Sequence, residues 1–433
     1  MIILRGGKMG KKTLKKIEEG IVLVVGCGNV GSVALHKMAK RPDVFREIHV
    51  VTRTGTQAEK VRDSILLKTQ GEVEIRLHKD DFSNIGKAIC LIRKVQPDLV
   101  MNIGPPYWNL EIMRACLNYR VHYLDTACYE HPDQYGFSNE EQLAMHGEFR
   151  QQGLMAMLQC GFDPGVTNIF VAYAIQKNLL DTIDSIDILD CNAGTKNAVW
   201  APNFDPEINI RELVLPIKSV LNGQWKEHGR IIDDDAIHFP FKFPQAGVEP
   251  AYLMYHEELE SLKRSFPGIG RMRFWMTFSE KYLTFLRVLH TVGLTRIDPI
   301  DYEGHSVIPV KFLKKLLPTG DDFNESYEGK TCIGCILKGF KDGREKVIYI
   351  YQVCDHKEAF LETGGNAIGY TTAVPAVVGA LMMLQSDSPW LEAGVFVPES
   401  RQAKPFLTEL AKNGLPWHVE ILSDLPEFLK QDF

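Results

Sequence analysis

Three polar or glycine-rich segments each follow a short apolar run in the first half of the sequence. They are residues 102–107, 125–130 and 160–168. They carry Tyr107, Asp125 and Asp163, whose phenol and carboxyl groups can donate or accept a proton. Since the carboxyl ends of parallel strands share one edge of a sheet, we expect the three segments to form the walls of one ligand cleft.

Each of these three residues also has a structural interpretation. Asp125 is equally suited to cap the turn that follows its strand. Tyr107 is also typical of a packed aromatic residue, or of one that stacks on the ring of a bound ligand. Asp163 precedes Pro164 and Gly165, a setting that favours a helix N-cap. The sequence alone leaves the choice open.

The element that must position these loops is the segment 21–53. Residues 21–25 are apolar and largely β-branched, which predicts a buried strand. The pattern Gly26-x-Gly28-x-x-Gly31 follows directly, continues at helical spacing, and leads to a second apolar run at 48–51. This strand–helix–strand pattern predicts a dinucleotide-binding fold; the alternative is a glycine-rich turn in another α/β protein.

The three glycines have distinct physical roles in such a fold. Gly26 permits the tight turn, Gly28 lets the backbone approach the phosphates, and Gly31 lets the helix pack against the strand. The first N–H groups of the helix then face the pyrophosphate with the positive end of the helix dipole.

The end of the second strand distinguishes between nicotinamide cofactors. An NAD site usually places Asp or Glu there, whereas this chain reads Thr52-Arg53-Thr54. The Arg53 guanidinium is suited to a 2′-phosphate, so we predict NADP(H); the alternative is that Arg53 points into solvent. The predicted cofactor-binding residues are Gly26, Gly28, Asn29, Val30, Gly31, Thr52, Arg53, Gly104 and Pro105.

Composition excludes several classes of function. The chain has 433 residues, 45% of them hydrophobic and 24% charged, and a net charge of −6. It therefore lacks a basic footprint for nucleic acid, and no apolar run approaches the roughly 18 residues of a membrane span. The nine cysteines lack the spacing of a disulfide scaffold, which favours reduced thiols and a cytoplasmic protein.

The alternation of strand-like and helical runs predicts an α/β protein with a doubly wound, Rossmann-type parallel sheet. Further strands are expected at 72–77, 97–102, 121–126 and 154–158, and a long polar helix at 138–152. We expect a basic extension at 1–20, an NADP-binding domain at 21–160, an inserted α+β substrate-binding and dimerisation domain at 161–355, and a segment at 356–433 that returns to the first domain.

Several motifs resemble one known family. They are the Gly-Cys-Gly-Asn-Val-Gly fingerprint, residues 124–130, 161–168, 200–212, 353–356, and 364–368 with 372–375. Together they resemble the saccharopine dehydrogenase superfamily, and within it the carboxynorspermidine (carboxyspermidine) dehydrogenases. The chain departs from that pattern at Cys128, where Asn is commoner, which argues against a catalytic role for this thiol.

The resemblance implies a reaction and a set of ligands. An ω-amine of putrescine or 1,3-diaminopropane would condense with L-aspartate semialdehyde, and NADPH would reduce the imine, as a step of polyamine biosynthesis in a homodimer. The substrate carboxylate calls for Arg211 or Arg271, and the diamine calls for acids such as Asp205, Glu207 or Glu212. Trp200 could wall the methylene chain, whereas residues 233–235 are more typical of a solvated acidic face.

Three alternatives remain at this point. A saccharopine reductase would need more Arg and Lys around a substrate with three carboxylates. A homospermidine synthase-like enzyme or a non-catalytic NADP-binding protein on the same fold is also compatible with the fingerprint. Cys332, Cys335, Cys354 and His356 could be read as a zinc site, but we predict no metal, because residues i and i+3 of a strand face opposite sides.

Overall fold

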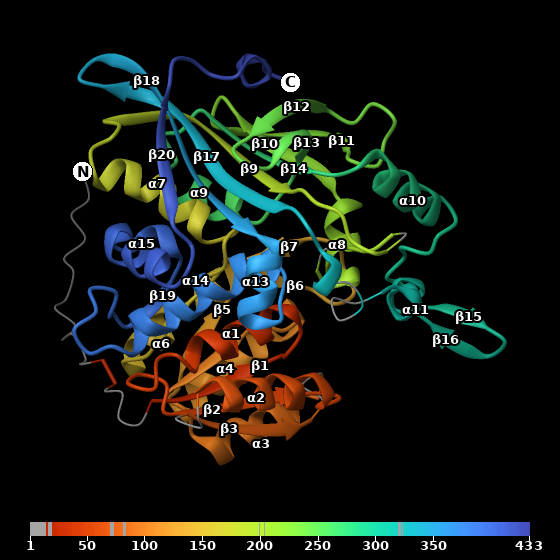
Figure 1. The fold of residues 1–433 in the computed structure, drawn as a ribbon, viewed down its shortest axis with the longest axis vertical. Coiled ribbons are helices and arrows are strands. Elements are labelled where there is room, and N and C mark those ends of the chain that lie inside the picture. The colour runs from red at the N-terminus through yellow and green to blue at the C-terminus, as the bar shows by residue number, and fades with distance from the viewer. Residues whose placement is uncertain are drawn as a thin grey trace, which may run out of the picture.

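Two sheets, one above the other in Figure 1, organise the chain. The computed structural model describes residues 14–15, 20–69, 73–80, 84–198, 200–202, 204–318, 322 and 324–433. Most of the predicted extension at 1–20 lies outside these residues.

The first sheet is parallel throughout the described chain and has the strand order β19-β8-β5-β4-β1-β2-β3. Its strands are β1 (Ile21–Val25), β2 (Glu47–Thr52), β3 (Glu74–Lys79), β4 (Leu99–Asn102), β5 (His122–Asp125), β8 (Met155–Met157) and β19 (Gly394–Phe396). The order reverses direction between β1 and β4, so the ligand crevice of this doubly wound sheet opens there. The predicted Rossmann-type sheet is confirmed, with strand ends shifted by one or two residues.

Alternate residues of β1 enter two different cores. Val22 and Val24 pack with the core that contains α1, whereas Leu23 and Val25 pack with the core that contains α3 and α4. Helices therefore cover both faces of this sheet, which explains why its strands are continuously apolar. The helices are α1 (Asn29–Met38), α2 (Thr56–Thr69), α3 (Ile85–Val95), α4 (Asn109–Tyr119), α5 (Glu140–Ala144), α6 (His146–Gln152), α14 (Ala367–Leu384) and α15 (Ala403–Lys412).

The single helix predicted at 138–152 is wrong in detail. The chain forms the short strand β7 (Phe137–Ser138), then α5 and α6, which meet at Met145. The Met145 side chain is buried in the α3–α4 core, so packing fixes the junction between the two short helices.

Helix α14 lies inside the molecule and joins the two domains. Contrary to the prediction that no apolar run approaches the length of a membrane span, this helix is long and apolar enough to cross a membrane, the one such helix of the described chain, but 89% of its apolar window is buried. A Cβ at Gly379 would lie 2.4 Å from Cys160 Sγ, so only glycine permits this close approach to the loop after β8. This position is that of a core helix.

The second sheet is mixed and holds nine strands within the described chain. Its order is β11-β10-β14-β9-β17-β18-β20, and β13 pairs with both β14 and β12. The strands are β9 (Thr182–Asn192), β10 (Pro216–Leu221), β11 (Gln224–Arg230), β12 (His238–Phe243), β13 (Gly247–Met254), β14 (Arg271–Thr277), β17 (Lys330–Lys341), β18 (Arg344–Asp355) and β20 (Trp417–Leu422). One face packs on the core that continues from the first sheet, so the two domains share buried surface.

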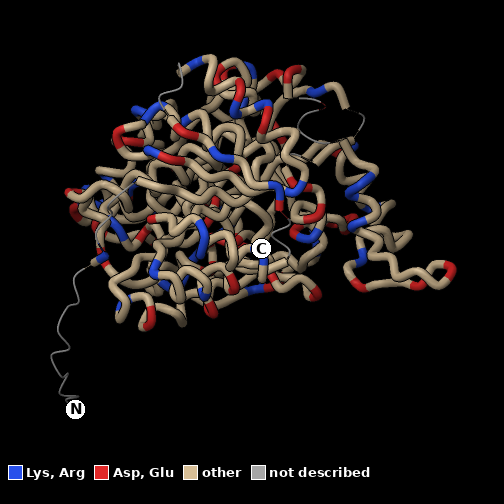
Figure 2. Tube along the Cα trace, turned by 90° about the horizontal axis from the view of Figure 1, so that it is seen from below, with Lys and Arg blue, Asp and Glu red and all other residues tan. Residues whose placement is uncertain are grey.

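Helices of the second domain cover that inner face or project from it. They are α7 (Val166–Gln176), α8 (Pro206–Leu213), α9 (Glu258–Ser265), α10 (Glu280–Thr291), α11 (Pro309–Leu316) and α13 (His356–Thr363). The hairpin β15 (Ile300–Tyr302) and β16 (His305–Val307) extends away from the body beside α11 (Figure 1). Figure 2 shows Lys and Arg interspersed with Asp and Glu over the view from below.

The prediction that 356–433 returns to the first domain needs one correction. Helix α14 packs on α1, and β19 extends the parallel sheet, as expected. However, β20 pairs with β18 in the second sheet, with Trp417 opposite Gln352. An exposed edge of β18 would leave unpaired backbone groups, and β20 satisfies them.

Candidate active site

The turn after β1 forms a cradle of bare backbone. Gly26 has φ +100°, and a Cβ there would lie 3.3 Å from the Gly104 backbone. A Cβ on Gly31 would lie 2.8 Å from the Gly26 carbonyl oxygen. Gly28 is the N-cap of α1, supplies no capping side chain, and faces open space. These residues fit a pyrophosphate held by the first N–H groups of α1.

Asn29 connects this cradle to α14. Its side-chain amide donates to Asn366 Oδ1 at 2.8 Å, and its Oδ1 accepts from the Asn366 N–H at 3.0 Å. Asn366 in turn caps α14. The Asn29 side chain is thus committed to helix packing, and the predicted contact with the cofactor falls to its backbone. The neighbouring Val30 is half-buried against the core.

The remaining predicted cofactor residues lie along the same edge of the sheet. Thr52 ends β2, and Arg53 is exposed just beyond it, with no ion-pair partner among the described residues. The N–H of Gly104 donates to Asn102 Oδ1 at 3.2 Å, and Pro105 is the N-cap of the short 3-10 helix η1 (Pro106–Trp108). Contact of Arg53 with a 2′-phosphate stays a prediction.

Asp125 has a structural place rather than the predicted catalytic one. It is buried at the end of β5, where its Oδ1 accepts from the Gln159 N–H and its Oδ2 accepts from Gln142 Nε2, both at 2.7 Å. Asn109 Nδ2 approaches the same Oδ2 at 3.3 Å. Burial raises the pKa of Asp125 to about 7 in spite of these donors. Its carboxyl group fixes the three loops to one another.

Beyond β5 the structure brings three carboxyl groups together. Glu130 lies on the two-residue strand β6 (Tyr129–Glu130), Glu212 on α8, and Glu257 just before α9. One oxygen from each side chain lies within 4.8 Å of the others, and all three residues are buried. We call these residues the carboxylate cluster. It lies at the junction of the two domains, since β6 follows the first sheet and α8 belongs to the second domain (Figure 1).

Burial shifts the carboxyl groups of this cluster toward their protonated, neutral forms. Burial raises the pKa of Glu130 to about 7 and that of Glu212 to about 8, and it raises the pKa of Glu257 as well. Glu130 Oε1 and Glu212 Oε2 are buried without a hydrogen-bond partner in the described part of the chain. Glu257 Oε2 accepts from the Cys128 N–H at 2.5 Å. Such groups are costly to ionise unless a cation is nearby.

Arg211 is close to the cluster but is not free to bind a substrate carboxylate, contrary to the prediction. Its Nε donates to Glu130 Oε2 at 3.0 Å, and its Nη atoms donate to the carbonyl groups of His131, Pro132 and Gln134. The side chain is almost fully buried. Arg211 therefore holds the loop that carries Glu130 and neutralises one oxygen of that carboxylate.

Tyr107 lies next to this ion pair. Its ring is 5.0 Å from the Arg211 guanidinium carbon, and its hydroxyl is buried with no hydrogen-bond partner among the described residues. Burial, followed by the Glu130 charge, raises the pKa of the Tyr107 phenol. The phenol is thus protonated and available as a donor, which keeps its predicted catalytic role open.

Asp163 is not the helix N-cap that the sequence favoured. Helix α7 begins at Val166 with Gly165 as its N-cap, and Asn168 Oδ1 accepts from the Gly165 N–H at 3.0 Å. Asp163 instead forms a hydrogen bond with the Asp190 carboxyl group on β9. Burial and the Asp190 charge raise the pKa of Asp163 well above its ordinary value, so the pair holds a proton.

His256 links this carboxyl pair to the cluster. It precedes Glu257, stacks on Phe274, and forms an ion pair with Glu258. Burial alone lowers the pKa of His256, but the Glu258 carboxylate outweighs burial and raises that pKa well above 6.5. Its charge is therefore already matched within the protein.

Two residues of the predicted substrate wall also have structural partners. Asp205 is the N-cap of α8, accepts from the N–H groups of Glu207 and Ile208, and pairs with Lys314 at 2.6 Å. It is committed to these contacts and is not the predicted ligand of the diamine. Trp200 stacks on Tyr282. Burial and the Glu212 charge raise the pKa of Tyr282, so the Tyr282 ring separates Trp200 from the cluster.

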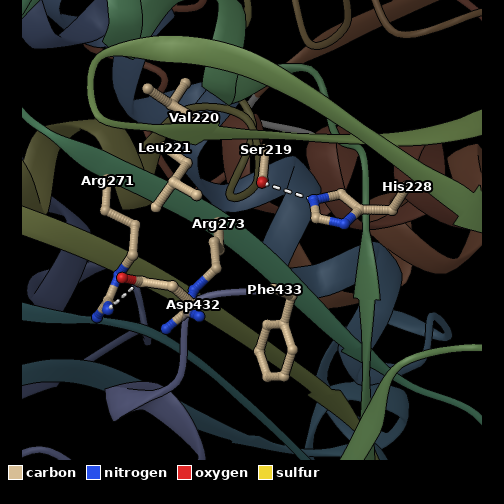
Figure 3. A pocket seen from close by; sticks show the side chains of 8 residues that line it. All are labelled: Ser219, Val220, Leu221, His228, Arg271, Arg273, Asp432 and Phe433. Atoms are coloured by element: carbon tan, nitrogen blue, oxygen red, sulfur yellow. Dashed lines mark hydrogen bonds and ion pairs between the residues drawn. The ribbon is translucent and has the colours of Figure 1, made fainter.

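Arg271 lies in a different part of the second domain. It begins β14, paired with Ser185 near the start of β9, whereas Asp190 lies farther along β9. Its guanidinium pairs with Asp187 at 3.2 Å and Asp432 at 3.3 Å. The prediction that Arg271 binds the substrate carboxylate is therefore not supported. It lines a small pocket with Ser219, Val220, Leu221, His228, Arg273, Asp432 and Phe433 (Figure 3).

The cysteines proposed as an alternative zinc site face different cores. Cys332 contacts Tyr349 on one face of β17, whereas Cys335 donates toward the Thr167 carbonyl on the other. Two ligands on opposite faces of one strand cannot approach the same ion.

Sequence reasoning missed several residues of this site. Glu130 ends the motif at residues 124–130, but nothing in that motif marks its carboxylate as part of a site. Glu257, His256 and Asp190 carry no local signal, because each reaches the site through long-range packing. The resemblance offered one hint, since a diamine substrate calls for acids such as Glu212.

The fold and site are those of a nicotinamide-dependent oxidoreductase of two domains. The saccharopine dehydrogenase NADP binding domain family matches residues 22–157, and the saccharopine dehydrogenase C-terminal domain family matches residues 161–415. The chain belongs to the saccharopine dehydrogenase family. It is an NADP-dependent oxidoreductase, which confirms the predicted class and cofactor.

Curated relatives place the chain more narrowly. Carboxyaminopropylagmatine dehydrogenase of Synechocystis sp. is 44% identical over 94% of this chain and 98% of the relative. Carboxynorspermidine synthase of Vibrio cholerae is 37% identical over 92% of this chain and 96% of the relative. Saccharopine dehydrogenase (L-Glu forming) of Saccharomyces cerevisiae shares the fold, with a TM-score of 0.68, 12% identity, and coverage of 93% of this chain and all of that one. These relatives support a role in polyamine biosynthesis.

Proposed function

We propose that this enzyme condenses a primary amine that carries a second cationic group with L-aspartate semialdehyde and reduces the resulting imine. NADPH supplies the hydride when it is bound. Amine and aldehyde join with loss of water, and the product is a carboxylated polyamine. The candidate amines are putrescine and 1,3-diaminopropane, with agmatine added because one relative is named for an agmatine derivative.

The observation that carries this proposal is the acidic character of the site. Buried carboxyl groups of Glu130, Glu212 and Glu257 lie just beyond the NADP-binding edge. A cationic amine suits them, whereas saccharopine, with three carboxylates, would be repelled. A saccharopine reductase is therefore not favoured. A non-catalytic NADP-binding protein would have no use for buried, unpaired carboxyl groups.

Two groups of the chain are suited to proton transfer. Loss of water from the carbinolamine needs an acid, and the protonated Asp163–Asp190 pair can donate. The Tyr107 phenol is a second donor at the same edge. Protein donors occupy both carboxyl oxygens of Asp125, so we assign proton transfer to the other two groups.

The test is an amine screen with the purified protein. NADPH oxidation is followed with L-aspartate semialdehyde and, in turn, putrescine, 1,3-diaminopropane, agmatine or glutamate. We expect turnover with at least one cationic amine and none with glutamate. Turnover with glutamate alone, paired with its own semialdehyde partner, would reject the proposal in favour of a saccharopine reductase. NADPH binding without turnover of any pair would favour a non-catalytic protein.

We further propose that the enzyme is a cytoplasmic homodimer that associates through its second domain. Exposed apolar side chains of the second domain support this interface. They are Val288 on α10, Val292 just after α10, Tyr302 on β15, and Phe312 and Leu316 on α11. Light scattering after size exclusion checks the dimer, and Phe312→Asp should shift it toward monomer.

A further inference from the structure

The carboxylate cluster has acceptors that the protein does not use. Glu130 Oε1 and Glu212 Oε2 have no hydrogen-bond partner among the described residues, and the two residues are only 2% and 7% exposed. The oxygens that face one another across the cluster come from three separate segments: β6, α8 and the turn before α9. An unpaired buried acceptor is costly, and two of them in one cluster of three carboxyl groups indicate a donor from outside the chain.

The charges around the cluster do not balance within the protein. Arg211 neutralises one oxygen of Glu130 and is otherwise occupied by backbone carbonyl groups. His256 is paired with Glu258. Lys314 is paired with Asp205 at 2.6 Å. Among the described residues, Glu212 and Glu257 form no ion pair, and the charge that acts on both is that of His256, which is already paired with Glu258.

We propose that Glu130, Glu212 and Glu257 bind the far cationic group of the amine substrate, the one that does not react. This inference rests on the proposed function, because it assigns one end of the proposed substrate to named residues. The cluster then recognises a substrate by its second charge, and the methylene chain carries the reacting amine toward the nicotinamide.

The spacing of the three carboxyl groups admits an ammonium group. An ammonium donates three tetrahedral hydrogen bonds of about 2.8 Å, which places its acceptors about 4.6 Å apart. The three oxygens lie within 4.8 Å of one another, so one ammonium can reach all three. The same bound also admits a metal ion, whose adjacent oxygen ligands lie about 3 Å apart for Mg²⁺, and the metal arm of the test distinguishes the two. A guanidinium uses the same acceptors with planar donors.

Chemistry identifies which end of the amine binds here. The reacting nitrogen must lose its proton before it attacks an aldehyde. Three carboxylates stabilise the protonated form of an amine and so suppress its nucleophilicity. The cluster therefore suits the charge that the substrate keeps during the reaction, and the reacting end belongs near Asp163.

The first test compares amines with and without a second charge. Wild-type enzyme is assayed with putrescine, agmatine and n-butylamine, which keeps the chain length of putrescine but lacks its second ammonium. We expect Glu212→Gln and Glu257→Gln each to lower kcat/KM for putrescine at least ~10-fold and to leave n-butylamine within ~2-fold. The agmatine arm reports whether a guanidinium is accepted. Glu358→Gln, at an exposed site on α13, is the matched control and should change neither value.

Equal losses for putrescine and n-butylamine would overturn the proposal, because the cluster would then act on the reacting end or on folding. Unchanged selectivity would also overturn it. If activity requires added Mg²⁺ or Ca²⁺ and a chelator abolishes it, the cluster is a metal site and the proposal is wrong.

A binding measurement separates this inference from the proposed function. Calorimetry of putrescine against the NADP⁺-loaded protein should show a Kd that rises at least ~10-fold in Glu212→Gln. Binding that depends on Glu212 without turnover of any amine would reject the reaction but retain the cation site. Turnover of amines with no discrimination by charge would retain the reaction and reject the site. The variant should melt no lower than wild type, because Gln keeps the shape of a carboxyl group that burial already favours in its neutral form.

Discussion

The glycine cradle and the carboxylate cluster recognise opposite charges by different means. The cradle is one contiguous segment, residues 26–31, in which bare backbone and the N-terminus of α1 face the place of an anion. The cluster is assembled from residues 130, 212 and 257, and its side chains face the place of a cation. Both lie at the carboxyl edge of the parallel sheet, so an anionic cofactor and a cationic substrate meet there.

The two regions also differ in what they cost the fold. The cradle needs only the absence of side chains, and its N–H groups are free at the start of any helix. The cluster buries carboxyl groups whose pKa values are raised by burial, so it destabilises the protein until a cation arrives. The cofactor site is therefore encoded by one short stretch of sequence, whereas the substrate site depends on how two domains pack.

The largest effect should come from the residue that braces the cluster. Arg211→Ala removes four hydrogen bonds and leaves Glu130 buried without its cation. We expect a loss of about 3–5 kcal/mol in the free energy of unfolding, measured by denaturant titration. Arg264→Ala, at a largely exposed position, is the control and should cost under ~1 kcal/mol. If Arg211→Ala costs no more than this control, Arg211 does not stabilise the loop that carries Glu130.

The cradle should respond in affinity rather than in stability. Gly31→Ala places a Cβ 2.8 Å from the Gly26 carbonyl oxygen, so the turn that carries the N–H groups must shift. We expect NADPH affinity to fall about 100-fold, or about 2.7 kcal/mol, by calorimetry. Gly147→Ala, where an added Cβ meets nothing within 4 Å, is the matched helical control. Equal affinity in both variants would contradict the role of Gly31.

This difference explains what the sequence could and could not predict. The parallel sheet follows from local periodicity and glycine spacing, and it is found where expected. Arg211 was correctly placed near the site, but its role was not, because the carbonyl groups that it binds come from a loop far away in sequence. Asp125 likewise looked catalytic until the donors from Gln142 and Gln159 were visible.

Strand pairing and charge compensation were the least predictable features. Nothing local indicates that β20 leaves the first domain to cover the edge of β18. The exposed tip of β2 shows the converse case, since the pattern alone locates Arg53 there, and its contact with a 2′-phosphate stays a prediction.

Arg53 tests whether the local sequence pattern also predicts a contact with the cofactor. If its guanidinium binds the 2′-phosphate, Arg53→Ala should weaken NADPH about 10-fold and NADH under ~2-fold. Fluorescence titration with each nucleotide measures both values. The nearby Arg62→Ala, whose guanidinium pairs with Asp63, controls for a general loss of positive charge. A similar loss for NADH and NADPH would mean that Arg53 merely points into solvent.

The smallest effect comes from a buried base in the first sheet. His122 on β5 accepts from the Met155 N–H at 2.9 Å, and burial, aided by the Lys15 charge, lowers its pKa to about 4. Because the folded state favours neutral His122, its contribution is complete above pH ~6.5 and is lost as the pH falls toward ~4. From about pH 7 to about pH 5.5 this linkage should cost about 1 kcal/mol.

Stability measured by denaturant titration across that range checks the sign. His122→Asn retains an acceptor for Met155 but cannot be protonated, so its stability should fall less than that of wild type. The carboxylate cluster should act in the opposite direction, because acids with raised pKa values lose their contribution as the pH rises. A His122→Asn variant that follows the wild-type curve would show that acid sensitivity arises outside the first sheet, and the contrast between the two regions would then rest on the cluster alone.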